Sequence, residues 1–436
     1  MTESGLRRVA VLGGIRIPFC RSHTAYAELS NLGMLTTALT GLADRFSLHG
    51  VHVDEVIGGA VVTHAKDWNL AREAVVASPL ARTTPGITMM QACGTSLQGA
   101  LGLAAKIATG QIECGIAMGS DTTSDAPIVF QKKFAKRLVE ASRAKSMGQR
   151  LRAFKGMSPG ELAPVPPDTR EPRTGLGMGE HCELMAKEWG IARKDQDLLA
   201  FKSHRKAAAA YDNGFMDDLV IPCAGVFRDN NVREDISLEK MAELKPVFDK
   251  HGGTITAANS TPLTDGAATV LLASEKWAKS KGIPIQAYLT LGRTSAVDYV
   301  EGEGLLMAPT VAVSELLQQA GLTLQDFDYY EVHEAFAAQV LATLKAWESK
   351  SYCQTRLGRN APLGAIDISK MNVEGSSIAI GHPFAATGAR ILAVLAKLLH
   401  NGSGKRGLIS VCTAGGMGVA AILEGVGAPD PADGAT

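Results

Sequence analysis

The stretch MMQACGTSLQGALGLAAKIATG, residues 89–110, combines a tight turn with a helix that has no continuous polar face. Lys106 is its one charged residue, and the other positions are apolar, small or uncharged. A helix without a polar face has to be buried on all sides. The sequence therefore predicts that Cys93, in the turn before this helix, lies where a strand meets a central buried helix.

Cys93 is a candidate nucleophile because of this position. At the start of a helix, unpaired N–H groups and the positive end of the helix dipole favour a thiolate over a thiol. Most free cysteines, however, are small buried hydrophobic residues with no chemical role. The turn alone leaves both interpretations open.

A second copy of the same turn and helix follows 289 residues later, with His382 in the place of Cys93. A repeat of this size indicates a pseudo-twofold pair of domains, because solenoid repeats are much shorter. If the two buried helices pack face to face, Cys93 and His382 come close together, and His382 is a proton acceptor rather than a structural imidazole. The further pairs in this register are Gly99 with Gly388, Ala100 with Ala389, Leu103 with Leu392 and Ala104 with Ala393.

Strands and helices alternate in both halves of the chain, which predicts a mixed or parallel sheet covered on both faces. Two amphipathic helices, 178–191 and 194–214, interrupt this alternation, and residues 254–274 return to strand character. The first-half elements are strands at 7–13, 53–62 and 114–124 and helices at 29–46 and 70–76; the second half has a helix at 310–320. The predicted domains are residues 1–124 with 246–278, an inserted, mostly helical domain at 125–245, a second half at 279–427, and a flexible tail at 428–436.

Composition excludes several classes of protein. Lys plus Arg equals Asp plus Glu at 44 each, so no overall charge favours nucleic acid. The seven cysteines are scattered without a CxxC pair, which favours a reducing compartment over a disulfide framework or a zinc ribbon. No apolar run has the length of a membrane span, and the N-terminus has no signal-peptide pattern. The chain is therefore expected to be cytoplasmic.

The basic stretch 131–155 departs from this balance, with nine Lys or Arg against one acid, Glu140. It is either a solvated helical face or a surface for a phosphate-rich ligand, an anionic membrane or a partner subunit.

Two further sequences carry candidate chemical groups. Cys412, in SVCTAGGMG, ends a strand and opens a glycine-rich loop without the spacing of a phosphate-binding loop. A cysteine beside backbone N–H donors suits proton transfer near an oxyanion. His333, in VHEAFAAQ, follows another strand, and Ala337 stands where a zinc protease of the HExxH type needs its second histidine. No metal site is predicted.

Five segments together resemble the thiolases, the acyl-CoA C-acyltransferases. They are CGTS at 93, ITAANSTPLTDGAA at 255, HEAFAAQ at 333, GHPFAATGAR at 381 and CTAGGMG at 412, in a resemblance that extends from Val9 to Glu424. It implies an α/β fold of two βαβαβαββ halves in five αβαβα layers, with a loop domain inserted in the first half. HEAF is similar to the β-subunits of fatty-acid oxidation trifunctional complexes.

The resemblance also implies a role for each candidate residue. Cys93 would be the nucleophile that carries the acyl group as a thioester, His382 would activate it, and Cys412 would be the acid/base at the substrate α-carbon. His333 would hold the thioester oxygen, and a second oxyanion hole would use the backbone N–H groups of Cys93 and Ala414, where the family usually has Gly. The implied substrate- or CoA-binding residues are Thr261 and Met178.

The implied activity is thiolytic cleavage of 3-ketoacyl-CoA in fatty-acid β-oxidation, with coenzyme A as a substrate and no bound cofactor. Gly177 stands before Met178 where short-chain thiolases usually have His, which favours a medium or long acyl chain. The alternatives are a biosynthetic acetoacetyl-CoA thiolase, a structural subunit of a multienzyme complex, and a ketoacyl synthase, which Cys412 disfavours.

The implied assembly is a homodimer or tetramer, with an enoyl-CoA hydratase/3-hydroxyacyl-CoA dehydrogenase subunit as a further partner. Membrane contact would pass through 131–155, and no nucleic acid is expected. The basic residues of the insertion are expected beside the CoA nucleotide.

Overall fold

The computed structural model describes residues 6–427, so the predicted tail at 428–436 lies outside the described residues. The strands are β1 (Val9–Arg16), β2 (Cys20–Arg21), β3 (Glu55–Gly59), β4 (Gly86–Thr88), β5 (Cys114–Asp121), β6 (Val129–Phe130), β7 (Pro164–Val165), β8 (Thr264–Ser274), β9 (Ala287–Ala296), β10 (Tyr329–Val332), β11 (Arg406–Thr413) and β12 (Met417–Gly425). The α-helices are α1 (Asn31–Arg45), α2 (Leu70–Ala77), α3 (Thr95–Ala108), α4 (Lys132–Arg143), α5 (Met147–Ala153), α6 (Met178–Glu188), α7 (Arg193–Asp212), α8 (Leu238–Ala242), α9 (Glu275–Ser280), α10 (Ala308–Ala320), α11 (Ala337–Glu348), α12 (Lys350–Thr355), α13 (Ser377–Ile380) and α14 (Thr387–Asn401).

The main sheet is mixed, as the alternation predicts, and it runs through both halves of the chain. Its strand order is β10-β11-β12-β9-β1-β8-β5-β3-β4. The pairs β3–β4, β3–β5 and β10–β11 are parallel, and the other pairs along this order are antiparallel. The two halves join where β1 meets β9, through Ala10 opposite Tyr288 and Val11 opposite Ala287.

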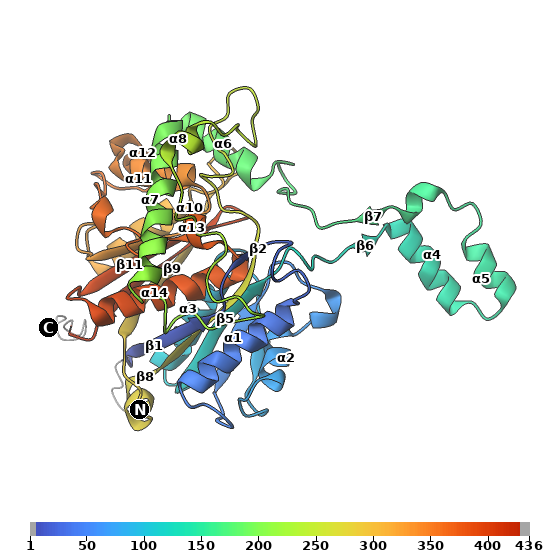
Figure 1. The fold of residues 1–436 in the computed structure, drawn as a ribbon, viewed down its shortest axis with the longest axis horizontal. Helices are drawn as coiled ribbons and strands as arrows, with labels where there is room; N and C mark the ends of the chain where they lie inside the picture. The colour runs from blue at the N-terminus through green and yellow to red at the C-terminus, as the bar shows by residue number, and fades with distance from the viewer. Residues whose placement is uncertain (1–5, 428–436) are drawn as a thin grey trace.

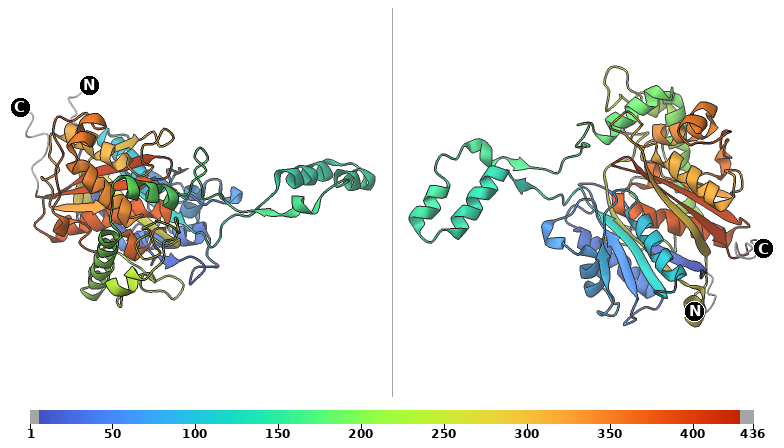
Figure 2. Two further views of the ribbon diagram at one scale, coloured as in Figure 1. Left: turned by 90° about the horizontal axis from the view of Figure 1, so that it is seen from above. Right: turned by 180° about the vertical axis from the view of Figure 1, so that it is seen from behind.

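The helices form layers on either side of this sheet (Figure 1). Helices α1 and α2 cover the outer face of the first half, and α10 covers β9 and β12 in the second half. Helices α3 and α14 contact each other and lie between the two halves of the sheet (Figures 1 and 2). This is the duplicated, layered α/β architecture that the sequence predicts.

Helices α3 and α14 approach each other closely because small residues line their contact. Ser96 Oγ donates to the carbonyl oxygen of Ala385 at 2.5 Å and accepts from the N–H of Ala389 at 2.8 Å. A Cβ on Gly388 would lie 2.4 Å from the backbone nitrogen of Leu97, so this position has room only for glycine. The predicted repeat is therefore a physical contact between the two copies.

The prediction that the first of these helices is buried on all sides is wrong at its C-terminal end. Ala105 is exposed, and Lys106 is half-buried, with its ammonium 2.8 Å and 2.6 Å from the two Glu55 carboxylate oxygens. Helix α14, in contrast, is buried from Thr387 to Leu399. The small side chains at the start of α3 allow close packing near Cys93, but they do not decide whether the last turn of the helix is buried.

The insertion forms two separate parts. Helices α6 and α7 pack on the second half, against α11 and α13. Strands β6 and β7 with α4 and α5 instead form an arm that projects away from the body (Figures 1 and 2). The nine basic residues of 131–155 lie on this arm rather than on the body of the chain.

Residues 254–263 are a loop, and the strand predicted over 254–274 begins only at Thr264. Side chains in the loop compete for its backbone groups, because the N–H of Thr256 donates to Asn259 Oδ1 at 2.7 Å and Ser260 Oγ donates to the carbonyl of Thr256 at 2.7 Å. The loop instead forms two isolated β-bridges with distant segments. Ser260 pairs with Phe336, and Leu263 pairs with His382.

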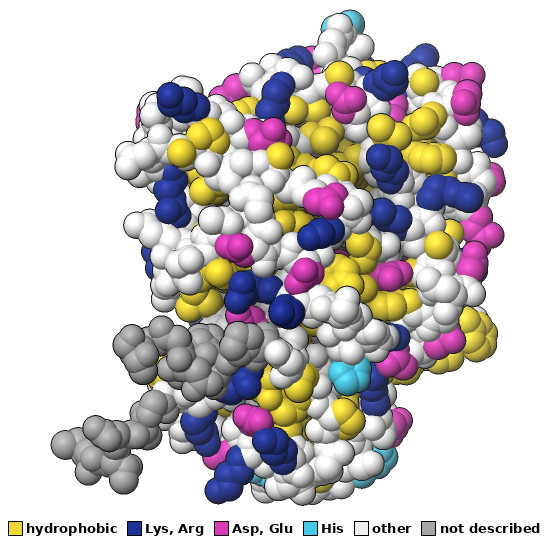
Figure 3. Space-filling view, turned by 90° about the vertical axis from the view of Figure 1, so that its left-hand side faces the viewer, with side chains coloured by type: hydrophobic (Ala, Val, Ile, Leu, Met, Phe, Trp, Pro, Cys, Tyr) yellow, Lys and Arg dark blue, Asp and Glu magenta, His cyan; other side chains and the backbone are white. Residues whose placement is uncertain are grey.

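The surface on the side away from the arm mixes acidic and basic side chains, without a large area of one sign (Figure 3). Within residues 6–427 no helix is both long enough and apolar enough to cross a membrane.

Candidate functional site

Cys93 lies in a strained turn at the start of α3. Ala92 has a φ of 46°, which is uncommon for a residue with a side chain and often marks a functional site. A Cβ on Gly94 would lie 2.8 Å from Val419 and 3.0 Å from Thr413, so the turn packs directly against the β11–β12 hairpin. Cys93 itself is 8% exposed.

His382 faces Cys93 from the second copy of the unit, as the repeat predicts. Its Nε2 lies 3.0 Å from Cys93 Sγ, and its Nδ1 lies 2.6 Å from Thr387 Oγ1 in the first turn of α14. Gly381, with a φ of 109°, turns the chain just before it, and the N–H of His382 donates to Thr264 Oγ1 at 3.2 Å. The histidine is therefore held at both ring nitrogens and at its backbone.

Burial makes the resting state of this pair neutral. It raises the pKa of the Cys93 thiol to about 12, although hydrogen bonding from the backbone N–H of Ala414 lowers that pKa in part. It lowers the pKa of His382 to about 3. The prediction of a resting thiolate is therefore wrong, because loss of solvation outweighs the helix dipole and the backbone donors.

His333 follows the end of β10 and completes a cluster with the first two residues. Its ring centroid lies 4.2 Å from that of His382, and Cys93 Sγ and the ligating nitrogens of the two histidines lie within 4.8 Å of one another. The side chain is fully buried, and burial followed by the charge of neighbouring groups lowers its pKa well below the ordinary histidine value. A sulfur and two imidazoles are also donors that zinc accepts. The thiol–imidazole hydrogen bond, however, is the geometry of proton transfer.

Cys412 lies near the end of β11, beside this cluster. Burial, and after it the charge of Cys93, raises the pKa of Cys412 well above the ordinary thiol value, so it is a protonated thiol at rest. The turn that follows takes its positive φ angles at Gly415 (77°) and Gly416 (69°). Ala414 is not among the residues with positive φ, so a side chain is tolerated where the family usually has glycine.

The two predicted binding residues contact segments that also carry residues of the site. Thr261 is half-buried, and its N–H donates to the carbonyl oxygen of Ala335 at 3.1 Å, two residues beyond His333. Met178, at the start of α6, packs against the apolar cluster that contains Cys412.

Three residues that the sequence did not single out support the site. Thr387 contacts His382, and Ser377 Oγ lies 2.8 Å from His333 Nδ1. Glu171, from the base of the arm, accepts from the N–H of Gly415 at 2.9 Å and from the hydroxyl of Tyr299 at 3.2 Å. Ser377 stands out only as a polar residue in the apolar run before GHP, and no sequence signal marks Glu171, because it is 244 residues from Gly415.

Sequence comparison relates the chain to proteins of known family. The thiolase N-terminal domain matches residues 9–276, and the thiolase C-terminal domain matches residues 285–425. A 3-ketoacyl-CoA thiolase of Shewanella baltica is 42% identical over 430 residues, which are 97% of this chain and 98% of the relative. One from Shewanella woodyi is 42% identical over 423 residues, or 96% and 97% of the two chains.

Solved structures agree with these matches. An acetyl-CoA acetyltransferase of Bacillus anthracis superposes with a TM-score of 0.80 at 28% identity, over 96% of this chain and 99% of its own. The human mitochondrial 3-ketoacyl-CoA thiolase superposes with a TM-score of 0.80 at 27% identity, over 97% of this chain and 100% of its own. Since both domain matches and the relatives extend over nearly the whole length, the chain belongs to the thiolase family of acyltransferases.

Proposed function

We propose that this chain is a 3-ketoacyl-CoA thiolase that cleaves its substrate through an acyl-enzyme on Cys93. The observation that carries the proposal is the 3.0 Å contact between Cys93 Sγ and His382 Nε2, made across the interface of the two central helices in a member of this family. The names of the relatives at 42% identity support the substrate class.

In the first step, the Cys93 sulfur attacks the 3-keto carbon while His382 Nε2 accepts the thiol proton. Because both groups are neutral at rest, proton transfer accompanies the attack rather than preceding it. This requires His382 to carry its own hydrogen on Nδ1 and to donate it to Thr387 Oγ1, which lies 2.6 Å away. The backbone N–H groups of Cys93 and Ala414, which hydrogen-bond the Cys93 sulfur, stabilise the negative charge that develops on the 3-keto oxygen.

In the second step, the bond between C2 and C3 breaks, and the electron pair goes to the acetyl-CoA fragment. Cys412 protonates that carbon, and its raised pKa keeps the thiol protonated until then. His333 and the imidazole of His382 hold the thioester oxygen of this fragment, on which the enolate charge develops. Free CoA then attacks the thioester carbon while its thiol proton passes to the Cys412 thiolate. The bond between that carbon and the Cys93 sulfur breaks, the sulfur regains its proton from His382, and the shortened acyl-CoA leaves, which completes a ping-pong cycle.

The acyl chain is proposed to be of medium or long length, in fatty-acid β-oxidation. Support comes from Gly177, which precedes Met178 and offers no side chain to close the site. CoA acts as a substrate, and no step calls for a metal or a bound cofactor. We propose that residues 1–124 with 246–278 and residues 279–427 form the two catalytic halves and that 125–245 is the insertion. The turn with Cys93 comes from the first half and the turn with His382 from the second.

We also infer that the arm contacts a protein partner. Ile128, Val129 and Phe130 are each more than half exposed, and exposed apolar side chains grouped on a projecting element are typical of an interface. The proposed partners are a second copy, in a homodimer or tetramer, and a hydratase/dehydrogenase subunit. Replacing 128–165 with a short flexible linker should reduce the oligomer mass in light scattering or abolish co-purification of the second subunit. Unchanged assembly together with lost binding to anionic vesicles would indicate membrane contact instead.

The catalytic proposal is tested by incubating the enzyme with a 3-ketoacyl-CoA and weighing the Cys93 peptide. We expect an added acyl mass that Cys93→Ala abolishes, while an unmodified peptide from folded enzyme contradicts the proposal. Thiolysis rates across 3-ketoacyl-CoAs of increasing length then test the chain preference. Activity confined to acetoacetyl-CoA would contradict it.

A further inference from the structure

The two ring nitrogens of His333 have different environments. Nδ1 lies 2.8 Å from Ser377 Oγ. Nε2 is buried and has no hydrogen-bond partner in the part of the chain that the structure describes. Nε2 belongs to the imidazole that shares the cluster with Cys93 and His382, so this cluster contains a ring with an unpartnered polar atom. A buried polar atom without a partner calls for an explanation.

The position of the hydrogen on His333 follows from the hydrogen bonds of Ser377. The side chain of Ser377 is fully buried, and Arg390 Nη2 donates to Ser377 Oγ at 2.7 Å. A guanidinium only donates, so this contact uses one lone pair of Oγ and offers nothing to the hydroxyl hydrogen. Among residues 6–427, the one acceptor within hydrogen-bond distance of that hydroxyl is His333 Nδ1.

We propose that Arg390 and Ser377 are positioning residues that fix His333 as the tautomer with its hydrogen on Nε2. The hydroxyl of Ser377 donates to Nδ1, which must then be the unprotonated nitrogen, so Nε2–H points into the cluster as a donor for the substrate oxygen. The opposite tautomer would place two donors on Ser377 Oγ, leave the buried hydroxyl hydrogen without an acceptor, and present a lone pair to the developing oxyanion. This inference rests on the proposed role of His333 in thiolysis and adds the device that sets it.

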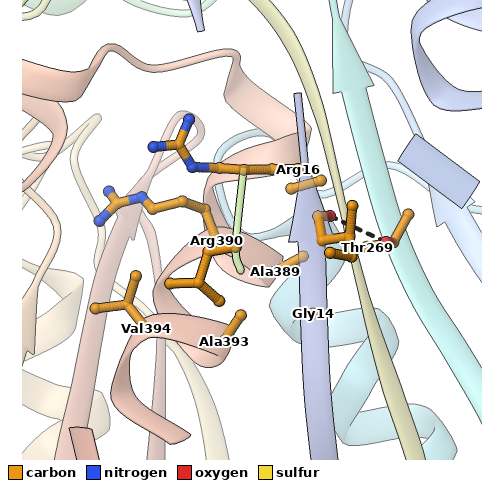
Figure 4. Close-up of a pocket in the computed structure, with 10 residues that line it drawn as sticks. Gly14, Arg16, Thr269, Ala389, Arg390, Ala393 and Val394 are labelled. Carbon is orange, nitrogen blue, oxygen red and sulfur yellow. Dashed lines mark hydrogen bonds between the residues drawn. The ribbon is translucent and has the colours of Figure 1, made fainter. Parts of the chain in front are cut away.

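The surroundings of Arg390 support a fixed donor. It leaves α14 beside a small cavity of about 10 Å³ between β1 and α14 (Figure 4), which has room for about one water molecule. Its Nη1 lies 3.9 Å from Glu331 Oε2, and both Nη1 and Nη2 lie 3.3 Å from Ser376 Oγ. Burial lowers the pKa of Arg390 only to about 10, so the guanidinium stays charged at neutral pH.

The neutral state of His333 is part of this arrangement. Burial lowers its pKa, and repulsion from a protonated His382 and from the charged Arg390 lowers it further, so the ring carries a single hydrogen. A neutral donor whose orientation is set before the substrate arrives costs no reorganisation during the reaction.

The direct test is the ring nitrogen spectrum of His333 in the full-length enzyme labelled with 15N-histidine. Solid-state NMR distinguishes a protonated from an unprotonated ring nitrogen, and His333→Asn identifies the signals of this residue by their loss. We expect Nε2 to be protonated and Nδ1 to be unprotonated and hydrogen-bonded. A protonated Nδ1 overturns the proposal, whatever the activity of the enzyme.

Two adjacent serines provide a matched pair of variants. Ser377→Ala and Ser376→Ala each remove one hydroxyl that accepts from Arg390, but only Ser377 contacts His333. We expect Ser377→Ala to shift the His333 Nδ1 resonance and lower kcat about tenfold, less than the 10²- to 10³-fold loss of a whole oxyanion donor. Ser376→Ala should leave the His333 resonances in place.

The two variants also separate this inference from the proposed function. If Ser377→Ala does not fold, the spectrum of the unaltered enzyme still decides the tautomer. Equal resonances and equal kcat in the two serine variants overturn the positioning role while thiolysis by Cys93 stands. Absence of thiolysis in the unaltered enzyme refutes the proposed function without changing the tautomer result.

Discussion

Replacing Gly388 with Ala should separate the two central helices and, with them, the reacting pair. The added Cβ would lie 2.4 Å from Leu97 N and 2.7 Å from Leu97 Cβ. Ordinary contact between such atoms is about 3.5 Å. Because the obstacle is backbone rather than the end of a flexible side chain, α3 and α14 have to move apart by roughly 1 Å.

The size of the effect follows from this displacement. Overpacking of a dense core costs about 1–3 kcal/mol in the free energy of unfolding. A 1 Å misplacement of reacting groups costs about 100-fold in rate, and the 3.0 Å contact of Cys93 with His382 crosses this same interface. Gly388→Ala should therefore lower kcat about 100-fold and destabilise the fold by about 1–3 kcal/mol.

Thiolysis kinetics and urea unfolding measure both quantities, with Gly102→Ala as the control. A Cβ on Gly102 would lie 3.7 Å from Ile57 Cδ1, which is ordinary contact, so this variant gains helix propensity without a clash. It should keep full activity. Wild-type kcat and stability in Gly388→Ala would refute the argument that helix spacing sets the distance between the thiol and the imidazole.

Three other outcomes are expected. Cys412→Ala should still acquire an acyl group on Cys93 from acetyl-CoA, as peptide mass will show, but should lose carbon–carbon cleavage and condensation; full condensation activity would contradict its acid/base role. Glu171→Ala should lower kcat about tenfold, since the N–H of Gly415 loses its 2.9 Å acceptor, and kinetics equal to wild type would show that the turn needs no anchor. The pKa of His382 is about 3 in the folded chain and about 6.5 in the unfolded chain. Because the unfolded state binds the proton first, the stability present above pH ~6.5 should be lost as the pH falls towards 3. Urea titrations at several pH values should show a shallower loss for His382→Asn than for the wild type, and an equal slope would contradict this.

The sequence was informative where the repeat imposed a register. Cys93 and His382 occupy equivalent positions of two similar units, so packing the units together had to bring these residues together, as their contact shows. The order of helices and strands in the layered core was also predictable, since the apolar periodicity of α1 or α10 reports which face is buried. The ends of β1, β3 and β8 differ from the predicted ranges.

The features that the sequence did not predict depend on contacts between distant segments. The local sequence marks Ser377 only as a polar residue at the apolar run before GHP, and its role depends on its contacts with Arg390 and His333. The arm projects because α4 packs against α5 and not against the body of the chain. The composition of 131–155 does not show which of these contacts forms. The ionisation of Cys93 depends on how deeply it is buried, whereas the turn alone suggested the opposite charge state.

The origin of Cys93 and His382 in different copies of one unit has a consequence for symmetry. In a twofold dimer of a single unit, residues on the axis face their own copies, so two thiols or two imidazoles would meet there. A thiol opposite an imidazole is then unattainable. Joining both copies in one polypeptide lifts that restriction, because each position of the pair can be altered independently. Because the two halves are separate stretches of one chain, one can carry the thiol and the other the imidazole.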